Sequence, residues 1–309
     1  MLKAYSVFKD LDKKACEILI NAGIQLDIST SEERPNKEEL SKLLDDYDIL
    51  IIGIKEKMTE DMITKIDKKI IATLSIGIDH IDKSFFESDL IKVINCQTSN
   101  VISVAEHIFA LILGLKKRII EANEIAIKGG TKKDLSARSN DISNRSIGII
   151  GAGKISREVI KIAKVFNMKI YCNTLNPEKH KDLLKQGVEF LDLESLLTKS
   201  DIITVNIPLN EENKNLISKD KIGLMKKTAT FINTSRAEIV DINELIRCAD
   251  ENETFNVGLD IDAENYMELL NTKRNNVIVT PHIAGVTKEA IKRMDVELAN
   301  NIIEYLKES

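Results

Sequence analysis

The feature that most constrains the fold is a glycine-rich turn between an apolar segment and a helix-forming one. The apolar segment covers residues 146–150, the turn reads Gly151-Ala-Gly-Lys-Ile-Ser156, and the helix-forming stretch follows at once. The first glycine permits a tight turn, the second lets the backbone approach a phosphate, and the helix N-terminus then attracts the anion. Ser156 replaces the third glycine of this fingerprint but is small enough for close helix–strand packing. The pattern predicts a pyrophosphate-binding turn formed by Gly151, Gly153, Lys154 and Ile155, although similar short turns also serve other nucleotide ligands or none.

Apolar segments of strand length alternate with helical patterns along nearly the whole chain. In the first third, the predicted strands cover residues 4–8, 25–28, 49–54, 70–75 and 92–95. A second series covers residues 146–150, 169–172, 202–207, 228–232, 257–260 and 277–279. Such alternation predicts parallel sheets with helices on both faces.

Predicted helices lie between these strands, over residues 13–22, 37–45, 60–66, 101–128 and 288–307. The glycine turn lies near the middle of the 309 residues, so a complete βα domain precedes it. We therefore predict an α/β fold with two Rossmann-like or flavodoxin-like domains, parallel sheets and a substrate cleft between the domains. The predicted substrate-binding domain comprises residues 1–98 and 286–309, and the predicted dinucleotide-binding domain comprises residues 99–285.

The composition excludes several classes of partner. With 43% hydrophobic residues, 30% charged residues and a net charge of −5, the chain lacks the basic excess of a nucleic-acid-binding protein. The most apolar run, residues 101–115, contains Glu106 and His107 and is too short to span a bilayer. It favours a helix buried between two subunits of a homodimer, or alternatively inside the core of a monomer. The N-terminal residues have no signal-peptide layout, and four scattered cysteines predict reduced thiols in the cytoplasm and no metal site.

Six stretches together resemble the D-isomer-specific 2-hydroxyacid dehydrogenases, the family of phosphoglycerate, D-lactate and glyoxylate/hydroxypyruvate enzymes. The stretches begin with Ser75-Ile-Gly-Ile-Asp-His-Ile-Asp82, Asn100-Val-Ile-Ser-Val-Ala-Glu-His107 and Gly148-Ile-Ile-Gly-Ala-Gly-Lys-Ile-Ser156. They continue with Ser200-Asp-Ile-Ile-Thr-Val-Asn-Ile-Pro-Leu209, Phe231-Ile-Asn-Thr-Ser-Arg-Ala-Glu-Ile-Val-Asp241 and Thr280-Pro-His-Ile-Ala-Gly285. They occur in the order and at the spacing of the family, and they cover nearly the whole chain.

The resemblance implies transfer of a hydride between a nicotinamide and a small D-2-hydroxy acid or 2-keto acid. That reaction needs a cation for the substrate carboxylate and a proton donor that works near neutral pH. Arg236 fits the first role, because it follows a strand and its planar fork can hold a carboxylate. His282 fits the second role as acid/base. His80 and His107 also lie in family-like stretches and are the alternatives to it.

A carboxylate beside His282 would keep the proton donor charged for ketone reduction. Glu264 is the favoured candidate and Asp262 the alternative, because the segment is one residue shorter than the family pattern and lacks its proline. The first domain is expected to offer backbone donors to the substrate carboxylate at Ser75, Ile76 and Gly77.

The tail of the substrate is less well defined by the sequence. Lys55 and Lys57 could reach a charged tail, or could be ordinary surface lysines. The arginine that phosphoglycerate enzymes tend to carry here has no counterpart in residues 52–57, which argues against a phosphorylated substrate.

The predicted second strand of the dinucleotide domain bears on the choice of cofactor. NAD-specific domains usually end this strand with an acid that binds the adenosine ribose, and here that position holds Thr174. No carboxylate appears before Glu178, so a ribose 2′-phosphate would meet no repelling charge beside Asn173 and Thr174. This favours NADP, or use of both cofactors. The resemblance implies further cofactor contacts at Pro208, Thr234, Asp260, His282 and Gly285.

Two alternative functions remain open at this point. One is a nucleotide-sensing protein without turnover, similar to the transcriptional corepressors of the same superfamily. The other is a formate or phosphonate dehydrogenase. Glu264 argues against a formate enzyme, because that branch carries glutamine beside the histidine.

Overall fold

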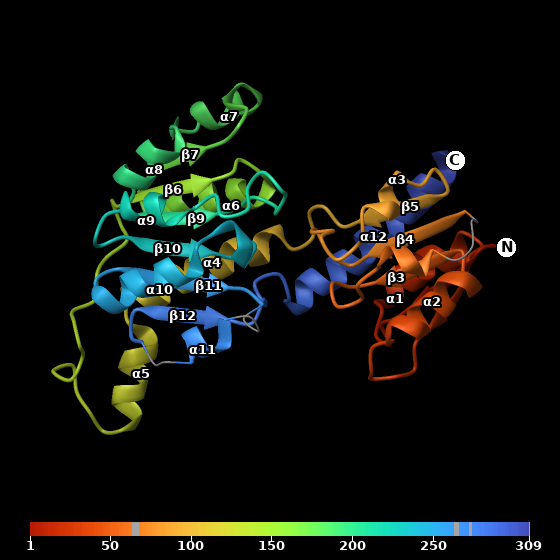
Figure 1. Ribbon diagram of the computed structural model, residues 1–309, viewed down its shortest axis with the longest axis horizontal. Helices are drawn as coiled ribbons and strands as arrows, with labels where there is room; N and C mark the ends of the chain where they lie inside the picture. Colours follow the sequence, from red (N-terminus) through yellow and green to blue (C-terminus); the bar gives the residue numbers. More distant parts are fainter. Residues whose placement is uncertain (64–67, 263–265, 272–273, 309) are drawn as a thin grey trace. The chain divides into compact units, whose positions relative to one another are not determined.

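The computed structural model describes residues 1–63, 68–262, 266–271 and 274–308, and it contains two compact units (Figure 1). Unit 1 comprises Met1–Asn100 and Val286–Ser309, and unit 2 comprises Val101–Gly285. The chain therefore leaves unit 1 once and returns to it near its end. The first crossing lies two residues after the boundary predicted from the sequence, and the second lies at the predicted place.

Unit 1 is built on one sheet of five parallel strands in the order β2-β1-β3-β4-β5. The strands are β1 Lys3–Ser6, β2 Gln25–Ile28, β3 Ile49–Ile52, β4 Lys69–Thr73 and β5 Ile91–Asn95. The helices are α1 Lys13–Asn21, α2 Lys37–Asp46, η1 Glu60–Met62, α3 Ser84–Glu87 and α12 Lys288–Glu308. The parallel sheet confirms the α/β fold class for this half of the chain.

Helices cover both faces of the sheet in unit 1, as expected for a parallel sheet whose central strand, β3, is apolar at every position. All four residues of β3 are buried. One face packs against α1 and α12, where Leu19 of α1 meets Leu298 and Ile302 of α12 in one core cluster. The other face carries a second cluster that includes Leu40 of α2 and Phe85 of α3. The last helix of the chain thus completes the core of the first unit.

Unit 2 contains seven parallel strands in the order β12-β11-β10-β9-β6-β7-β8. The strands are β6 Ser146–Ile150, β7 Lys169–Asn173, β8 Val188–Phe190, β9 Ile202–Val205, β10 Thr230–Asn233, β11 Asn256–Asp260 and β12 Val277–Thr280. The helices are α4 Val101–Lys116, α5 Ile119–Ile127, α6 Lys154–Val165, η2 Pro177–His180, α7 Lys181–Leu184, α8 Leu193–Lys199, α9 Lys219–Gly223, η3 Ala237–Ile239, α10 Ile242–Glu251 and α11 Met267–Leu270. The strand order reverses between β6 and β9, and ligands of such sheets bind outside the carboxyl ends of the strands at that point.

The helix predicted over residues 101–128 is in fact two helices, so that prediction is wrong at Arg118. This residue lies between α4 and α5 with φ 54, which ends the helical hydrogen bonding. Its buried guanidinium turns inward to Glu121 and Ser136. The apolar pattern continues across the break, so periodicity could not reveal it. A second expected helix, over residues 60–66, is a single 3₁₀ turn at Glu60–Met62, and residues 64–66 lie outside the described residues.

The apolar run within α4 packs inside its own unit. Ile108 and Ile112 are buried in a core cluster with residues of β6 and α6, and the helix also contacts β10 and β11. The intrachain core accounts for the buried face of this run, whereas Ile102 at the start of the helix is 52% exposed, and the homodimer stays a prediction. Among the described helices, none is both long and apolar enough to cross a membrane. Within the described ranges, no three His, Cys, Asp or Glu side chains form a group able to hold a metal ion.

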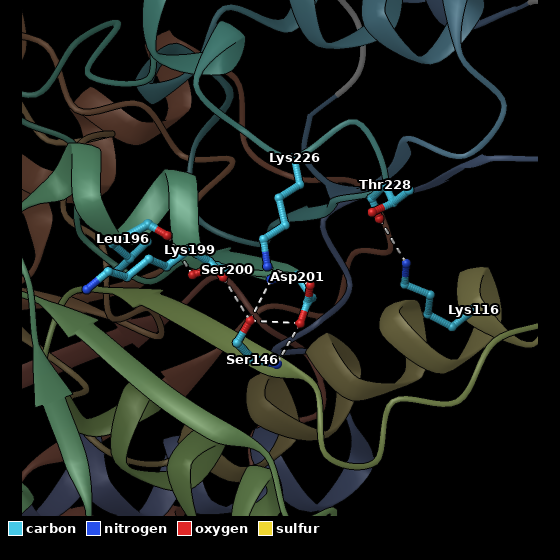
Figure 2. Close-up of polar contacts among 8 residues, drawn as sticks. All are labelled: Lys116, Ser146, Leu196, Lys199, Ser200, Asp201, Lys226 and Thr228. Carbon is cyan, nitrogen blue, oxygen red and sulfur yellow. Dashed lines mark hydrogen bonds and ion pairs between the residues drawn. The ribbon is translucent and has the colours of Figure 1, made fainter.

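Polar contacts fix the amino ends of the central strands of unit 2 (Figure 2). The backbone N–H of Ser146 donates to Asp201 Oδ2 at 2.9 Å, and its hydroxyl donates to the same oxygen at 2.8 Å. Lys226 Nζ donates to Asp201 Oδ1 at 2.8 Å. Burial opposes ionisation of Asp201, but the bonds from Lys226 and Ser146 outweigh it and hold its pKa below the ordinary value. Nearby, burial lowers the pKa of Lys116 to about 8, although its Nζ donates to the carbonyl of Thr228.

Candidate cofactor and active site

The glycine turn lies at the carboxyl end of β6 and leads directly into α6. Gly151 has φ +103, and a Cβ there would lie 2.6 Å from the carbonyl oxygen of Asn206, so this position requires glycine. Gly153 caps α6, and no atom lies within 4 Å of where its Cβ would be. Space for a phosphate therefore exists beside the N-terminus of a 12-residue helix, with Lys154 and Ile155 in its first turn.

The serine that replaces the third glycine is accommodated without loss of packing. Ser156 is fully buried, and Asn206 Nδ2 donates to its hydroxyl at 3.3 Å. Asn206 follows β9, so this bond links the end of β9 to the first turn of α6. The sequence contains no separate signal for Asn206, because the strand predicted over residues 202–207 includes it, whereas β9 ends at Val205.

The end of β7 carries amide and hydroxyl groups where NAD-specific domains carry an acid. β7 ends at Asn173, whose Nδ2 donates to the carbonyl of Leu191 at 2.9 Å, and Thr174 follows directly. Arg157 of α6 lies close by, paired with Asp182 and 3.3 Å from His180 Nδ1. Hydrogen bonding to Arg157 lowers the pKa of Asp182, so this acid is already paired with a cation.

The other predicted cofactor contacts lie at the same edge of the sheet. Pro208 follows β9, Thr234 follows β10, Asp260 ends β11 and Gly285 follows β12. Because carboxyl ends of parallel strands share one edge, these residues lie along the edge that holds the glycine turn. Their contact with a cofactor stays a prediction.

Asp260 has a clear structural role, because its fully buried carboxylate anchors the loop after β12. It accepts hydrogen bonds from the backbone N–H of Ile283 at 2.8 Å and of Ala284 at 2.7 Å. It also accepts from the hydroxyl of Thr280 at 2.6 Å. His107 Nε2 lies 3.0 Å from the same hydroxyl, which gives this histidine a structural partner.

His282 lies in the loop that Asp260 anchors. Its backbone is left-handed, with φ 54, and its N–H donates to the carbonyl of Thr280 at 3.0 Å. The side chain is 20% exposed, and Nδ1 lies 3.2 Å from Asp262 Oδ2. None of the described residues forms a hydrogen bond with Nε2. The imidazole is thus oriented through one nitrogen and presents the other.

Of the two carboxylates considered as the partner of His282, one lies among the described residues. Glu264, the favoured partner of His282, lies outside the described residues. Asp262, the alternative, is the carboxylate that contacts the ring. Asp262 is 77% exposed, so solvent screens its charge and the contact mainly orients the imidazole.

Arg236 occupies the turn between β10 and η3. Asn233 is fully buried, its Nδ2 donates to the carbonyl of Arg236 at 2.8 Å, and its Oδ1 accepts from Ser235 N at 2.9 Å. The half-buried guanidinium donates from Nη1 to the carbonyl of Ser235 at 3.1 Å. Neighbouring strands lie about 4.8 Å apart, so β10 and β12 end roughly 10 Å from one another, within reach of an arginine side chain. Arg236 and His282 therefore belong to one edge of one sheet.

In unit 1, the residues predicted to bind the substrate carboxylate form a braced turn after β4. The Ser75 hydroxyl donates to the carbonyl of Gly77 at 2.6 Å, and Asn95 Nδ2 donates to that of Ile76 at 2.7 Å. No hydrogen bond among the residues described uses the N–H of Ile76 or Gly77. His80 Nε2 lies 3.0 Å from the Thr73 hydroxyl, so this alternative histidine also has a structural partner.

Comparison with known proteins decides the family. Residues 109–284 match the NAD-binding domain of D-isomer specific 2-hydroxyacid dehydrogenases. The chain is 32% identical to a hydroxypyruvate reductase of Thermotoga maritima over 301 residues, which cover 96% of each chain. The chain belongs to the D-isomer-specific 2-hydroxyacid dehydrogenase family. This dehydrogenase is thus an NAD(P)-dependent oxidoreductase, as the sequence resemblance implied.

Of two solved structures similar to this dehydrogenase, one contains NADPH and the other contains NAD. An acyclic imino acid reductase, Bsp5, in complex with NADPH and D-Arg has a TM-score of 0.88 and 29% identity, covering 99% of this chain and 98% of that one. D-lactate dehydrogenase from Aquifex aeolicus, complexed with NAD and lactic acid, has a TM-score of 0.83 and 26% identity, covering 99% and 96%. The two-domain α/β prediction is confirmed, and cofactor preference is not decided by these relatives.

Proposed function

We propose that this dehydrogenase transfers a hydride between a nicotinamide and C2 of a small D-2-hydroxy acid or 2-keto acid. The observation that carries the proposal is the shared edge of Arg236, His282 and the glycine turn of unit 2. His282 presents Nε2 while Nδ1 is occupied by Asp262. The bound cofactor supplies or accepts the hydride, and the protein supplies the proton and the charges.

In the direction of reduction, His282 Nε2 gives its proton to the oxygen on C2, and in oxidation it takes the proton back. Arg236 holds the substrate carboxylate and polarises the neighbouring carbonyl through its planar guanidinium. The N–H groups of Ile76 and Gly77, with Ser75 bracing their turn, form a second set of donors for that carboxylate. Asp262 orients the imidazole, with Glu264 as the alternative for that role.

The direct test combines a substrate panel with one variant. Purified protein is assayed with glyoxylate, hydroxypyruvate, pyruvate and larger 2-keto acids against NADH and NADPH. His282→Ala should reduce turnover by about 10²- to 10⁴-fold, the usual contribution of general acid–base catalysis, while the folded variant still binds the cofactor through the glycine turn. Cofactor binding by the wild type without turnover of any 2-keto acid would favour the sensing protein instead. A parallel series with added ammonia tests whether the protein reduces the imines that 2-keto acids form with ammonia. Phosphite and formate, supplied as substrates, test the phosphonate and formate dehydrogenase alternatives.

We further propose that NADP serves as cofactor, alone or together with NAD. The support is Thr174 directly after β7, with Asn173 beside it and Asp182 paired to Arg157. Thr174→Asp should shift the ratio of kcat/KM for NADPH over NADH toward NADH, because a carboxylate repels the 2′-phosphate. A wild type that prefers NADH by about a hundredfold would contradict this proposal.

We also propose a homodimer, and the surface that supports it is that of α5 rather than the apolar run of residues 101–115. α5 exposes Ile119, Ile120 and Ile127, and exposed apolar side chains gathered on one helix often mark an interface. Light scattering on the wild type and on an Ile120→Lys variant tests the proposal. A wild type that is monomeric at micromolar concentration would contradict it.

A further inference from the structure

The strand order of unit 1 reverses between β1 and β3, which lie side by side. In open parallel sheets, ligands bind outside the carboxyl ends of the strands at such a point. Phe8 follows β1 and Glu56 follows β3, while Arg34 comes from the loop after β2. These three side chains meet at the carboxyl edge, one strand away from the Ser75–Gly77 turn after β4.

Glu56 is the buried element of this group, at 2% exposure. Its Oε2 accepts a hydrogen bond from the N–H of Gly53 at 2.7 Å. Its Oε1 is shielded from solvent and accepts no hydrogen bond from the described residues. A buried carboxylate needs a compensating charge, and Arg34 Nε, 3.8 Å from Oε1, supplies it.

The Arg34 guanidinium makes contacts within the protein and is also partly exposed to solvent. Its guanidinium carbon lies 4.0 Å from the centre of the Phe8 ring, and Nη1 donates to the carbonyl of Val7 at 3.3 Å. The side chain is nevertheless 39% exposed. Of the five N–H groups of a guanidinium, those on Nη2 make no hydrogen bond within the described part of the chain. Arg34 is therefore a pre-positioned donor fork at the edge of the sheet.

The geometry also explains why position 53, directly after β3, carries no side chain. A Cβ on Gly53 would lie 2.9 Å from Phe8 Cζ and 3.2 Å from Glu56 Oε2, so no side chain fits there. Phe8 fills that space and carries Arg34 on its ring face. The arginine absent from the segment after β3 is thus supplied by a different loop, which sequence spacing could not show.

We propose that Arg34, positioned by Phe8 and Glu56, determines specificity by binding an anionic group at the far end of the 2-keto acid, a second carboxylate or a phosphate. The Glu56 charge is buried and compensated, whereas Arg34 is accessible and the exposed Lys55 and Lys57 add positive charge nearby. This inference rests on the proposed function. It removes the argument against a phosphorylated substrate that was drawn from residues 52–57 alone.

The test compares substrates with and without a charged tail. Arg34→Gln should raise KM for oxaloacetate, 2-oxoglutarate or phosphohydroxypyruvate about 10- to 100-fold, the range for losing a hydrogen bond to a charged group. KM for pyruvate and glyoxylate should stay within about twofold, since these lack the group that Arg34 binds. Arg34→Lys keeps the charge that compensates Glu56 and should recover part of the affinity. Lys9→Gln is the matched control, since Lys9 is a neighbouring surface cation paired with Glu32.

The outcomes separate this inference from the proposed function. Turnover of pyruvate or glyoxylate by the wild type establishes the reaction, and only the tail selectivity tests Arg34. Equal changes in KM for all substrates would mean that Arg34 merely supports the fold, and would overturn the inference. So would a wild type that prefers uncharged tails while Arg34→Gln leaves that preference unaltered. Thermal unfolding and NADPH titration of both variants show whether the folded state is retained.

Discussion

His282 lies between two carboxylates that act on different parts of the residue. Buried Asp260 binds the backbone N–H groups of Ile283 and Ala284 and so fixes where the loop lies. Exposed Asp262 contacts Nδ1 and so fixes how the ring is turned. Non-glycine residues with φ near 54 are uncommon, and histidine is among those enriched there. Backbone placement and ring orientation are therefore controlled by separate acids.

Replacing Asp262 by asparagine tests the second of these controls. We expect Asp262→Asn to lower kcat at least about tenfold, a part of the 10²- to 10⁴-fold that acid–base catalysis contributes. NADPH affinity, measured by fluorescence, should not change, because the ring contact is remote from the glycine turn in sequence and in role. Glu264→Gln is the paired variant. A large loss of kcat in Glu264→Gln, with none in Asp262→Asn, would assign the role to Glu264.

Asp295 of α12 makes the stability of unit 1 depend on pH. Its buried side chain accepts from the N–H of Asp12, and burial raises its pKa from 3.8 to about 6. The folded state then binds more protons than the unfolded state between these values. The contribution of Asp295 to stability is therefore fully present below pH 4, decreases as the pH rises toward 6, and is lost above it.

Asp295→Asn keeps an acceptor for Asp12 and removes the buried charge. It should raise the free energy of unfolding at pH 7.5 by about 1 to 3 kcal/mol. The difference should vanish at pH 4, which urea unfolding at the two pH values can measure. Equal effects at both pH values would show that packing, not ionisation, is responsible.

At this scale, the sequence was sufficient to place Arg236 and His282 directly after strands, and their catalytic roles stay predictions. It was insufficient where the partner comes from a distant loop. Arg34 stands in a segment without periodicity, and only the fold brings it to Phe8 and Glu56. The roles of Asp260 and Asp262 likewise depend on how the loop after β12 turns.

At the scale of elements, the β6–turn–α6 segment contains two glycines, and each position holds glycine for a different physical reason. Gly151→Ala places a Cβ against the carbonyl of Asn206 at φ +103, so we expect a loss of about 1 to 3 kcal/mol in stability together with weaker NADPH binding. Gly153→Ala meets no protein atom, so it should weaken NADPH binding and leave the unfolding temperature unchanged. Thermal unfolding and NADPH titration of both variants test this. Equal destabilisation by the two substitutions would contradict it.

Strands were predictable because short apolar runs that alternate with helical patterns usually form strands buried on both faces of a parallel sheet. The β2 and β6 bounds agree with the prediction, and the others differ by at most two residues at an end. β8 was missed because Val188–Phe190 is too short to form a pattern. The break at Arg118 was missed because the apolar period runs through it, and a left-handed residue leaves no mark on that period.

At the scale of the whole molecule, the chain returns to unit 1 after unit 2, and its α12 helix completes the core of unit 1. A chain ending at Gly285 lacks α12, so the faces of α1 and the sheet that meet Met294, Leu298 and Ile302 become exposed. We expect unit 1 to unfold and unit 2 to survive as a protease-resistant, NADPH-binding fragment. A chain ending at Leu306 is the control, because it removes none of those three contacts. Circular dichroism and limited proteolysis measure the outcome, and an intact unit 1 in the shorter chain would contradict the expectation.

Sequence reasoning reached two α/β domains and assigned the last helix to the first of them. It could not decide what covers the apolar run of α4. A helix that is apolar over most of its surface reads the same whether its neighbours belong to the same chain or to another. Here β10, β11 and α6 of the same unit supply that cover.

The late position of α12 has a consequence for biosynthesis. A growing polypeptide emerges from the ribosome N-terminus first, and domains generally fold as they emerge. The first hundred residues of this chain must wait for the final twenty or so before their hydrophobic interior is closed. Unit 2 can be complete, and able to retain its coenzyme, while the part translated earliest is still unfinished.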